Sequence, residues 1–450
     1  MIQSSYLQIV RIGSDYIAYH SLFGRPLFLN EEAHDFLMSF AGGRLCHQFT
    51  PEQEAIATEF ARLNLIVDEG LNERALLEEK CLEYDVEIAT GSRVSYLSLI
   101  MAECCNFGCT YCIADAFQDE RSAKQHELLM PEGTAERAID EFMLLVQRHN
   151  HEEAYVNFGG GEPLLNFPVI KFAVEHCKDH YPGQRFKFAL NTNSSLVTPE
   201  IARFLYLHGF DIATSLDGIR EWNDRVRIWR NPNITGGTYN SILAGMGILR
   251  SAGNEITGFS VTITPENLPG IDEHLIDWLL AEGFNDLRLD LDAIHCYNEL
   301  DPNEIAHKLI HLKRYAKERG IYLSGFWERS IENMFPSVLE AHTSFCGGKR
   351  GNSMCIAPNG DIYICGYSGT KVGSVFDTMI PNPGYCQLIS QQLPGRNPRC
   401  IGCSIEGQCV GGCYIAEEMS SANKTSVLSF NCKFYLAATA ELLKDQVAVE

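Results

Sequence analysis

The chain has 450 residues, of which 45% are hydrophobic and 21% charged, as is usual for a globular protein large enough for two or three domains. Its 58 acidic and 36 basic side chains give a net charge of -22, which argues against nucleic acid as a partner because such binding depends on clustered Lys and Arg. The N-terminus lacks a signal-peptide pattern and no apolar run is long enough to span a membrane, so we expect a cytoplasmic protein without membrane attachment.

Residues 1–85 predict a small α+β unit. The runs "YLQIVRI", "YIAYHS" and "PLFLN" predict three short strands. Asn30 is expected to cap a helix over "EEAHDFLMSF", and Pro51 is expected to open a second helix.

From Val94 to about Phe326, strand-like runs alternate with helical segments. The strand-like runs are "VSYLSLIM", "EAYVNFG", "RFKFALN", "DIATS", "GFSVTIT", "DLRLDLD" and "GIYLSGF". This alternation predicts a parallel sheet with crossover helices, as in a full or partial (β/α) barrel with its site at the C-terminal strand ends. After Phe345 the periodicity fades while Cys, Gly, Asn and Pro increase, so we expect little apolar core there and a fold that depends on metal.

The 17 cysteines are the unusual feature of the composition. In a reducing cytosol, crowded cysteines are metal ligands more often than disulfides. Four of them stand alone and are interpreted as small buried apolar side chains: Cys46, Cys81, Cys177 and Cys296. The others fall mainly in two clusters, at residues 104–112 and 346–432.

The first cluster follows "VSYLSLIM", which places it at the mouth of the predicted barrel. Its spacing is C-x3-C-x2-C, through Cys105, Cys109 and Cys112. Three thiolates leave one iron of a 4Fe-4S cluster without a protein ligand, whereas a closed electron-transfer cluster takes four. A four-ligand zinc site is the alternative, but no fourth His or Cys lies near in the sequence. Cys104 does not fit the spacing and is interpreted as a packing residue.

This motif, with an aromatic residue before its last Cys, resembles the radical S-adenosylmethionine (SAM) superfamily. The resemblance implies an α/β fold with a partial (β/α)6 barrel over residues 86–330. It implies that Cys105, Cys109 and Cys112 hold a 4Fe-4S cluster whose open iron chelates SAM. One electron, from an external donor such as flavodoxin or ferredoxin, would split SAM to methionine and a 5′-deoxyadenosyl radical that takes a substrate hydrogen. Tyr111 would lie beside the adenine.

The second strand ends in "NFGGGEPLLN", which contains Gly159, Gly160, Gly161 and Glu162. The glycines allow the backbone to approach a ligand closely, and the carboxylate can meet a cation. Taken alone, the stretch would be interpreted as a tight turn. One β/α unit after the cysteine motif, it resembles the GGEP motif of the same superfamily, which implies that Gly160, Gly161 and Glu162 hold the SAM ammonium group.

Two weaker correspondences follow the fourth strand. Ser215, in "SLDG", resembles the residue that contacts the SAM ribose. Arg227 resembles the one that pairs with the methionine carboxylate, for which a planar guanidinium with parallel donors is well suited.

The late cysteines resemble the SPASM extension, a C-terminal domain with two auxiliary 4Fe-4S clusters. The sequence "CIGCSIEGQCVGGC" contains Cys400, Cys403, Cys409 and Cys413, and Cys432 follows. Upstream, "CIAPNGDIYIC" begins at Cys355 and ends at Cys365, with Cys346 before it. Taken singly, these spacings also fit zinc ribbons. The resemblance places a bridging region and SPASM domain at residues 331–435, followed by a C-terminal helix at 436–450.

The same resemblance implies how the ligands are shared. The distal cluster would take Cys400, Cys403, Cys409 and Cys432, and the proximal cluster would take Cys346, Cys365 and Cys413. Cys355 could close the proximal set, or it could pack in the interior as a small hydrophobe. Cys386, in a Pro/Gly-rich stretch, is interpreted as free.

Residues 1–85 resemble a PqqD-like leader-recognition domain, which binds a precursor peptide by adding a strand to its sheet edge. A winged-helix-like capping domain is the alternative. Together the resemblances imply a radical SAM/SPASM maturase of a ribosomally made peptide, similar to sactipeptide, ranthipeptide and cyclophane synthases, that forms a C-S or C-C cross-link.

Two other functions remain open. One is a maturase of a folded protein, of the quinone-cofactor or sulfatase type. In the sulfatase type, an acidic residue follows the cysteine that ends a G-x4-C motif and acts as the base. In this sequence the motif runs from Gly360 to Cys365, and Gly366 follows it. The other is an iron-sulfur electron carrier, which would need neither an open iron nor a GGEP-like loop.

Overall fold

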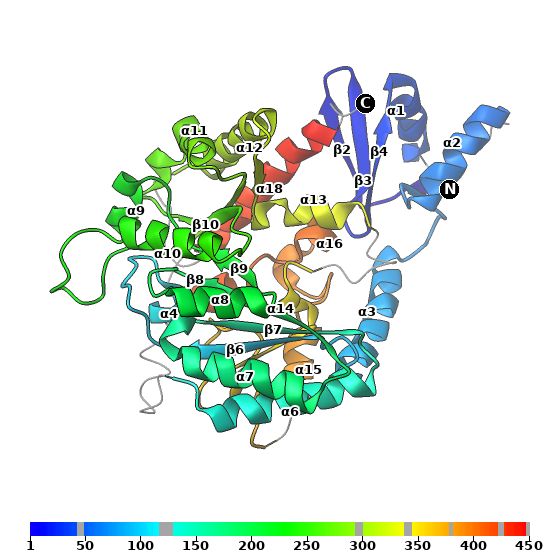
Figure 1. Ribbon diagram of the computed structural model, residues 1–450. Helices are drawn as coiled ribbons and strands as arrows, with labels where there is room; N and C mark the ends of the chain where they lie inside the picture. The colour runs from blue at the N-terminus through cyan, green and yellow to red at the C-terminus, as the bar shows by residue number, and fades with distance from the viewer. Residues whose placement is uncertain are drawn as a thin grey trace.

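The computed structural model describes residues 1–42, 49–116, 129–292, 300–336, 344–377, 381–421 and 427–446. Cys46 and Cys296 lie outside these ranges. No helix within them is long and apolar enough to cross a membrane. Figure 1 shows a strand-rich N-terminal unit beside a larger body in which helices surround a curved sheet.

The N-terminal unit contains the three predicted strands as an antiparallel meander, β2 (Leu7–Ile12), β3 (Asp15–His20) and β4 (Gly24–Leu29). The helices α1 (Glu31–Met38) and α2 (Pro51–Arg62) follow, and the short strands β1 (Ile2–Gln3) and β5 (Ile66–Val67) pair with each other. Asn30 caps α1 as predicted, since its side chain accepts a hydrogen bond from Ala33 N at 2.8 Å. Pro51 opens α2, which Thr50 caps.

Both faces of the meander are covered. On β3, Ala18 packs with Leu37 and Phe60 from the helices of the unit. The neighbouring side chains Ile17 and Tyr19 point to the other face and belong to the main core of the molecule. Helix α3 (Glu73–Thr90) then leads from this unit to the larger body, so it crosses the boundary predicted at residue 85.

All seven strand-like runs of the middle region form strands. They are β6 (Tyr96–Ala102), β7 (Glu153–Gly160), β8 (Arg185–Thr192), β9 (Asp211–Thr214), β10 (Gly258–Ile263), β11 (Asp286–Leu291) and β12 (Tyr322–Ser324). Strands β6 to β9 are parallel neighbours, as are β10 to β12, and a single bridge between Ser215 and Ser260 joins the two groups. The predicted partial barrel is therefore confirmed.

Helices between the strands cover the outside of this sheet (Figure 1). They are α4 (Ile113–Ala116), α6 (Glu132–Arg148), α7 (Phe167–His180), α8 (Pro199–Leu207), α9 (Arg220–Val226), α10 (Tyr239–Ser251), α11 (Glu273–Ala281) and α12 (Pro302–Glu318). Helix α6 illustrates why they pack: Ala135, Ala138, Ile139, Phe142 and Val146 are buried at helical spacing along one face.

The C-terminal region extends the barrel sheet. Strand β13 (Ser353–Ile356) pairs in parallel with β6, and β14 (Asp361–Tyr363) and β15 (Gly373–Ser374) continue in antiparallel order. Met354 and Ile362 are fully buried in the main core, so this region has more apolar core than its sequence predicts.

Short helices lie before and after these strands in the chain. They are α13 (Arg329–Met334) and α14 (Gly347–Arg350) before β13, and α15 (Pro383–Ser390), α16 (Glu406–Cys409) and α17 (Tyr414–Ser421) after β15. The last helix, α18 (Val427–Asp445), begins before the predicted residue 436 and includes Cys432.

Candidate functional site

The cysteine motif lies in the loop after β6, at the C-terminal end of the first barrel strand. Backbone hydrogen bonds fix this loop against the segment after α9, from Gly108 N to Ile228 O at 2.8 Å and from Thr110 N to Val226 O at 2.9 Å. Burial raises the pKa of the Cys105 thiol to about 12, and charges on Glu162 and on the other two motif cysteines raise it further. The three predicted thiols therefore lie close together.

Two glycines bring the end of β7 against this loop. Gly160 has a φ of 117°, and a Cβ there would lie 2.3 Å from Ala102 O. A Cβ on Gly161 would lie 2.3 Å from Cys104 O. Gly161 N donates to Ala102 O at 2.7 Å, and Glu162 N donates to Cys104 O at 3.0 Å. The close approach that these glycines permit is thus to the main chain of the cysteine loop.

Glu162 is fully buried beside the thiols. Its Oε1 accepts hydrogen bonds from Leu164 N at 3.1 Å and Thr192 Oγ1 at 2.8 Å, and its Oε2 accepts one from Asn193 N at 2.8 Å. Burial raises its pKa to about 7, although these donors favour the anion. A carboxylate in this position gains from a cationic ligand.

Arg227 and Tyr111 are brought together around an aspartate that was not predicted from the sequence. Arg227 forms an ion pair with Asp217, with 2.9 Å between Nε and Oδ2. The Tyr111 hydroxyl donates to the same oxygen at 2.5 Å, and the Arg227 guanidinium carbon lies 5.6 Å from the Tyr111 ring centroid. Asp217 is fully buried. Its position in "SLDG", at the end of a barrel strand, was the available signal.

Two further polar residues stand near this group. Ser215 lies at the β9–β10 junction, where its hydroxyl is 3.4 Å from Asn191 Oδ1. Asn193, at the end of β8, places its Nδ2 3.7 Å from Cys105 Sγ and 2.9 Å from Asn106 Oδ1. An amide donor to a ligand sulfur stabilises negative charge on it. Asn193 was not predicted either.

The predicted proximal cysteines also gather. Burial raises the pKa of the Cys365 thiol, and charges on Cys355, Cys346 and Cys413 raise it further. Cys355 is 2% exposed, on β13, and it packs with Ile100. It is therefore both near the other thiols and within an apolar cluster, so its role as a ligand stays a prediction.

The predicted distal cysteines form a third group. Burial raises the pKa of the Cys409 thiol to about 12, with further contributions from Cys432, Cys400 and Cys403. The isolated cysteines within the described ranges, Cys81 and Cys177, are fully buried as predicted. Cys386 belongs to helix α15 rather than to a loop.

Tyr367 is near thiols of both the first and the proximal group. Burial raises its pKa, and charges on Cys365, Cys112, Cys355 and Cys105 raise it further. The two groups of thiols therefore lie in the same region of the molecule.

The N-terminal unit contacts the distal loop directly. Gly407 N donates to Ser21 O at 2.9 Å, and a Cβ on Gly407 would lie 1.9 Å from Leu22 O. Arg74, at the start of α3, forms an ion pair of 2.7 Å with Glu406, whose side chain is fully buried. The β3–β4 turn and α3 are thus packed against the segment that carries Cys409.

The donor set suits iron-sulfur clusters. Most thiols of the three groups are partly buried, and such thiols near one another are poor thiolates by themselves, because each charge is desolvated and repelled by its neighbours. A metal cluster removes this penalty, and sulfur ligands favour iron or zinc. Residues of all three groups pack against the same main core, and the spacing of the cysteines in the sequence does not by itself ensure this.

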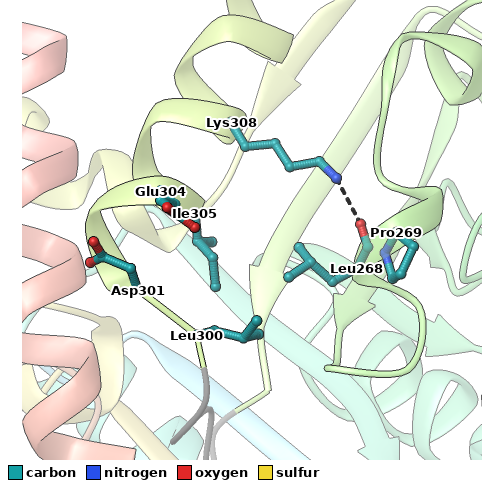
Figure 2. A pocket seen from close by; sticks show the side chains of 7 residues that line it. All are labelled: Leu268, Pro269, Leu300, Asp301, Glu304, Ile305 and Lys308. Carbon is teal, nitrogen blue, oxygen red and sulfur yellow. Dashed lines mark hydrogen bonds between the residues drawn. The ribbon is translucent and has the colours of Figure 1, made fainter.

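Figure 2 shows a surface hollow between the turn Leu268–Gly270 and the start of α12. Lys308 Nζ donates to Leu268 O at 2.9 Å on one side, and Asp301 and Glu304 lie on the other. None of its lining residues belongs to the thiol groups, so this hollow is not part of the site described above.

Comparison with known proteins identifies the central part of the chain. The Radical SAM superfamily matches residues 99–278. These residues form a radical SAM domain. The match includes the cysteine loop, Glu162, Asp217 and Arg227, and members of this family are enzymes that use a 4Fe-4S cluster and SAM for radical chemistry.

Similar proteins extend over most of the chain. The radical SAM cyclopropyl synthase TigE of Paramaledivibacter caminithermalis is 23% identical, over 95% of this chain and 92% of its own length. The solved structure of anSMEcpe with bound AdoMet has a TM-score of 0.60 at 17% identity and covers 78% of this chain and 99% of its own. Streptococcus suis SuiB has a TM-score of 0.52 at 15% identity, with coverages of 92% and 96%. These structures confirm the fold around the radical SAM domain.

Proposed function

We propose that the chain is a radical SAM enzyme that modifies a ribosomally made precursor peptide by forming a C-C or C-S cross-link. The observation that carries the proposal is the gathering of three thiol groups, the first of them beside a buried carboxylate and an Arg–Asp–Tyr cluster. TigE is named a cyclopropyl synthase, which favours a C-C bond.

The first thiol group, Cys105, Cys109 and Cys112, would hold the cluster to which SAM binds. When bound, this cluster supplies the electron that splits SAM into methionine and the 5′-deoxyadenosyl radical, which takes a hydrogen from the peptide. Glu162 accepts the SAM ammonium group, and its hydrogen bonds to Thr192 and Asn193 keep the carboxylate in place.

Arg227 and Tyr111 form the wall of the SAM site in this proposal. Asp217 fixes both side chains, so their orientation is set before SAM binds. Since Asp217 already pairs with Arg227, the SAM carboxylate would share the guanidinium rather than have it alone. Ser215, at the β9–β10 junction, is proposed to reach the ribose.

The proximal and distal thiols are proposed to hold two auxiliary 4Fe-4S clusters. The proximal one would be held by Cys346, Cys355, Cys365 and Cys413, and the chemistry it would supply is electron transfer near the first thiol group. An external donor such as flavodoxin or ferredoxin would supply the first electron.

The N-terminal unit is proposed to bind the leader of the precursor peptide. One face of its β2–β3–β4 sheet is covered by its own helices and the other by the main body, so its edge strands are what remains for a peptide to pair with. Deleting residues 1–85 would be a poor test, because it would cut α3 and remove the contacts to the distal loop. A peptide titration on the full chain avoids this problem.

SAM cleavage tests the enzyme function. Anaerobically reconstituted protein with dithionite and SAM should form 5′-deoxyadenosine, and a Cys105, Cys109 and Cys112 triple Ala variant should form none. Cys104→Ala is the matched control, because this neighbour lies outside the motif and should retain cleavage. Cleavage by the triple variant, or none by the wild type, would contradict the proposal.

Iron content tests the three clusters separately. Three 4Fe-4S clusters require about twelve irons per chain, and the triple variant should keep about eight. Fewer than about five irons in the wild type would remove the auxiliary clusters from the proposal while leaving SAM cleavage intact.

A further inference from the structure

Lys349 is an almost completely buried lysine. It lies in α14, three residues after Cys346, and is 1% exposed. Its Nζ donates to Val410 O at 2.6 Å and to Gly412 O at 3.0 Å. These two carbonyls belong to the short segment that connects Cys409 of the distal group to Cys413 of the proximal group.

The backbone of that segment is unusual. Val410, Gly411 and Gly412 are all left-handed, with φ values of 53°, 78° and 71°. A β-branched residue rarely adopts this conformation, so the surrounding structure must hold the strained backbone in place. Here the left-handed backbone points the carbonyl oxygens of Val410 and Gly412 toward the same ammonium group.

Lys349 lies against the backbone that joins the two groups of thiols. Its two carbonyl partners, Val410 and Gly412, directly follow Cys409 and directly precede Cys413. A Cβ on Gly411 would lie 3.5 Å from Lys349 Nζ and 3.7 Å from Cys400 Sγ, so the ammonium group is also near a distal thiol. It therefore lies close to ligands of the proximal and of the distal set.

No carboxylate among the described residues forms an ion pair with Lys349. Two neutral carbonyls do not compensate a buried ammonium ion, whose transfer out of water is strongly unfavourable. Cys-ligated 4Fe-4S clusters carry net negative charge, and an added electron increases it. An anionic group on either side would explain why the lysine is kept.

We propose that Lys349 is the shared counter-charge of the two auxiliary clusters, where it stabilises their reduced states and so raises both reduction potentials. This inference rests on the auxiliary clusters of the proposed function. It assigns a role to a residue that touches neither SAM nor the peptide, and it predicts that one side chain affects two clusters at once. The alternative is a purely structural one, in which Lys349 only holds the 410–412 turn by hydrogen bonds.

The test is a potentiometric titration of the reconstituted full chain, followed by electron paramagnetic resonance. Lys349→Met removes the charge at similar length, and Lys349→Arg keeps it. Lys371→Met is the control, because Lys371 is an exposed lysine of the same region, paired with Asp361. The SAM-binding cluster is an internal reference, since the hydrogen bonds of Lys349 go to the segment between Cys409 and Cys413 and not to the loop of the first thiol group.

We expect Lys349→Met to keep its iron and to move both auxiliary midpoints to lower potential, with the SAM-binding cluster unmoved; loss of the auxiliary irons in this variant would instead favour the purely structural role. Lys349→Arg and Lys371→Met should resemble the wild type. Unchanged auxiliary midpoints in Lys349→Met, an equal shift in Lys349→Arg, or loss of all three clusters together would overturn the inference. A wild type with only about four irons would instead contradict the proposed auxiliary clusters themselves.

Discussion

Replacing Gly161 by Ala should detach the cysteine loop from the end of β7. A Cβ at this position would lie 2.3 Å from Cys104 O, whereas ordinary contact begins at 3.4 Å. The two backbones must therefore separate by about 1 Å, since neither atom belongs to a flexible side chain. This shift strains the hydrogen bonds from Gly161 N to Ala102 O and from Glu162 N to Cys104 O. Overpacking and two weakened hydrogen bonds together should destabilise the loop by about 3–5 kcal/mol.

The assay is iron content with 5′-deoxyadenosine formation. Gly161→Ala should fall from about twelve irons per chain to about eight and lose SAM cleavage, because only the first thiol group is displaced. Gly133→Ala is the matched control: no atom lies within 4 Å of its Cβ, so it should keep all clusters. If Gly161→Ala kept its iron and only its affinity for SAM fell, the glycine would serve ligand approach, and our explanation of it would be refuted.

Two further predictions concern the N-terminal unit and the proximal thiols. His20 is neutral in the fold, because Nδ1 accepts from Leu22 N and Phe23 N while Nε2 donates to Glu73, and burial lowers its pKa despite that carboxylate. A folded pKa below the unfolded value of about 6.5 gives stability that is present above that pH and lost as pH falls through the folded pKa, so thermal unfolding should occur at lower temperature at pH 5 than at pH 7. His20→Gln should flatten this dependence and exposed His307→Gln should not; parallel pH profiles for all three proteins would contradict the assignment. Cys355→Ala should change the electron paramagnetic resonance of one auxiliary cluster while SAM cleavage continues, and unchanged spectra would identify Cys355 as a packing residue.

The sequence allowed the strands of the barrel to be predicted because each carries an apolar run bounded by polar turns. At residue 85, helix α3 continues without any local signal in the sequence, so the domain boundary there stays a prediction. The sequence also underestimated the core after Phe345, because the short β13 is stabilised by pairing with β6, and β14 by pairing with β13, rather than by their own pattern. Long-range pairing is not visible in a local window.

The candidate site was predictable where chemistry fixes the spacing, as in Cys105, Cys109 and Cys112. Asp217 was missed because its role is to hold Arg227 and Tyr111, and a supporting carboxylate has no spacing rule. Lys349 was equally invisible, since a lysine is usually a surface residue and only the fold reveals that this one is enclosed.

The pairing of β13 with β6 has a consequence for how the protein is made. Ser353 lies beside Tyr96, so the edge of the first barrel strand has no partner until most of the chain has left the ribosome. An unpaired, largely apolar edge strand invites association with other chains. A fragment limited to residues 86–330 would carry the radical SAM motif yet expose that edge permanently, so the catalytic part of this protein is not a separable module.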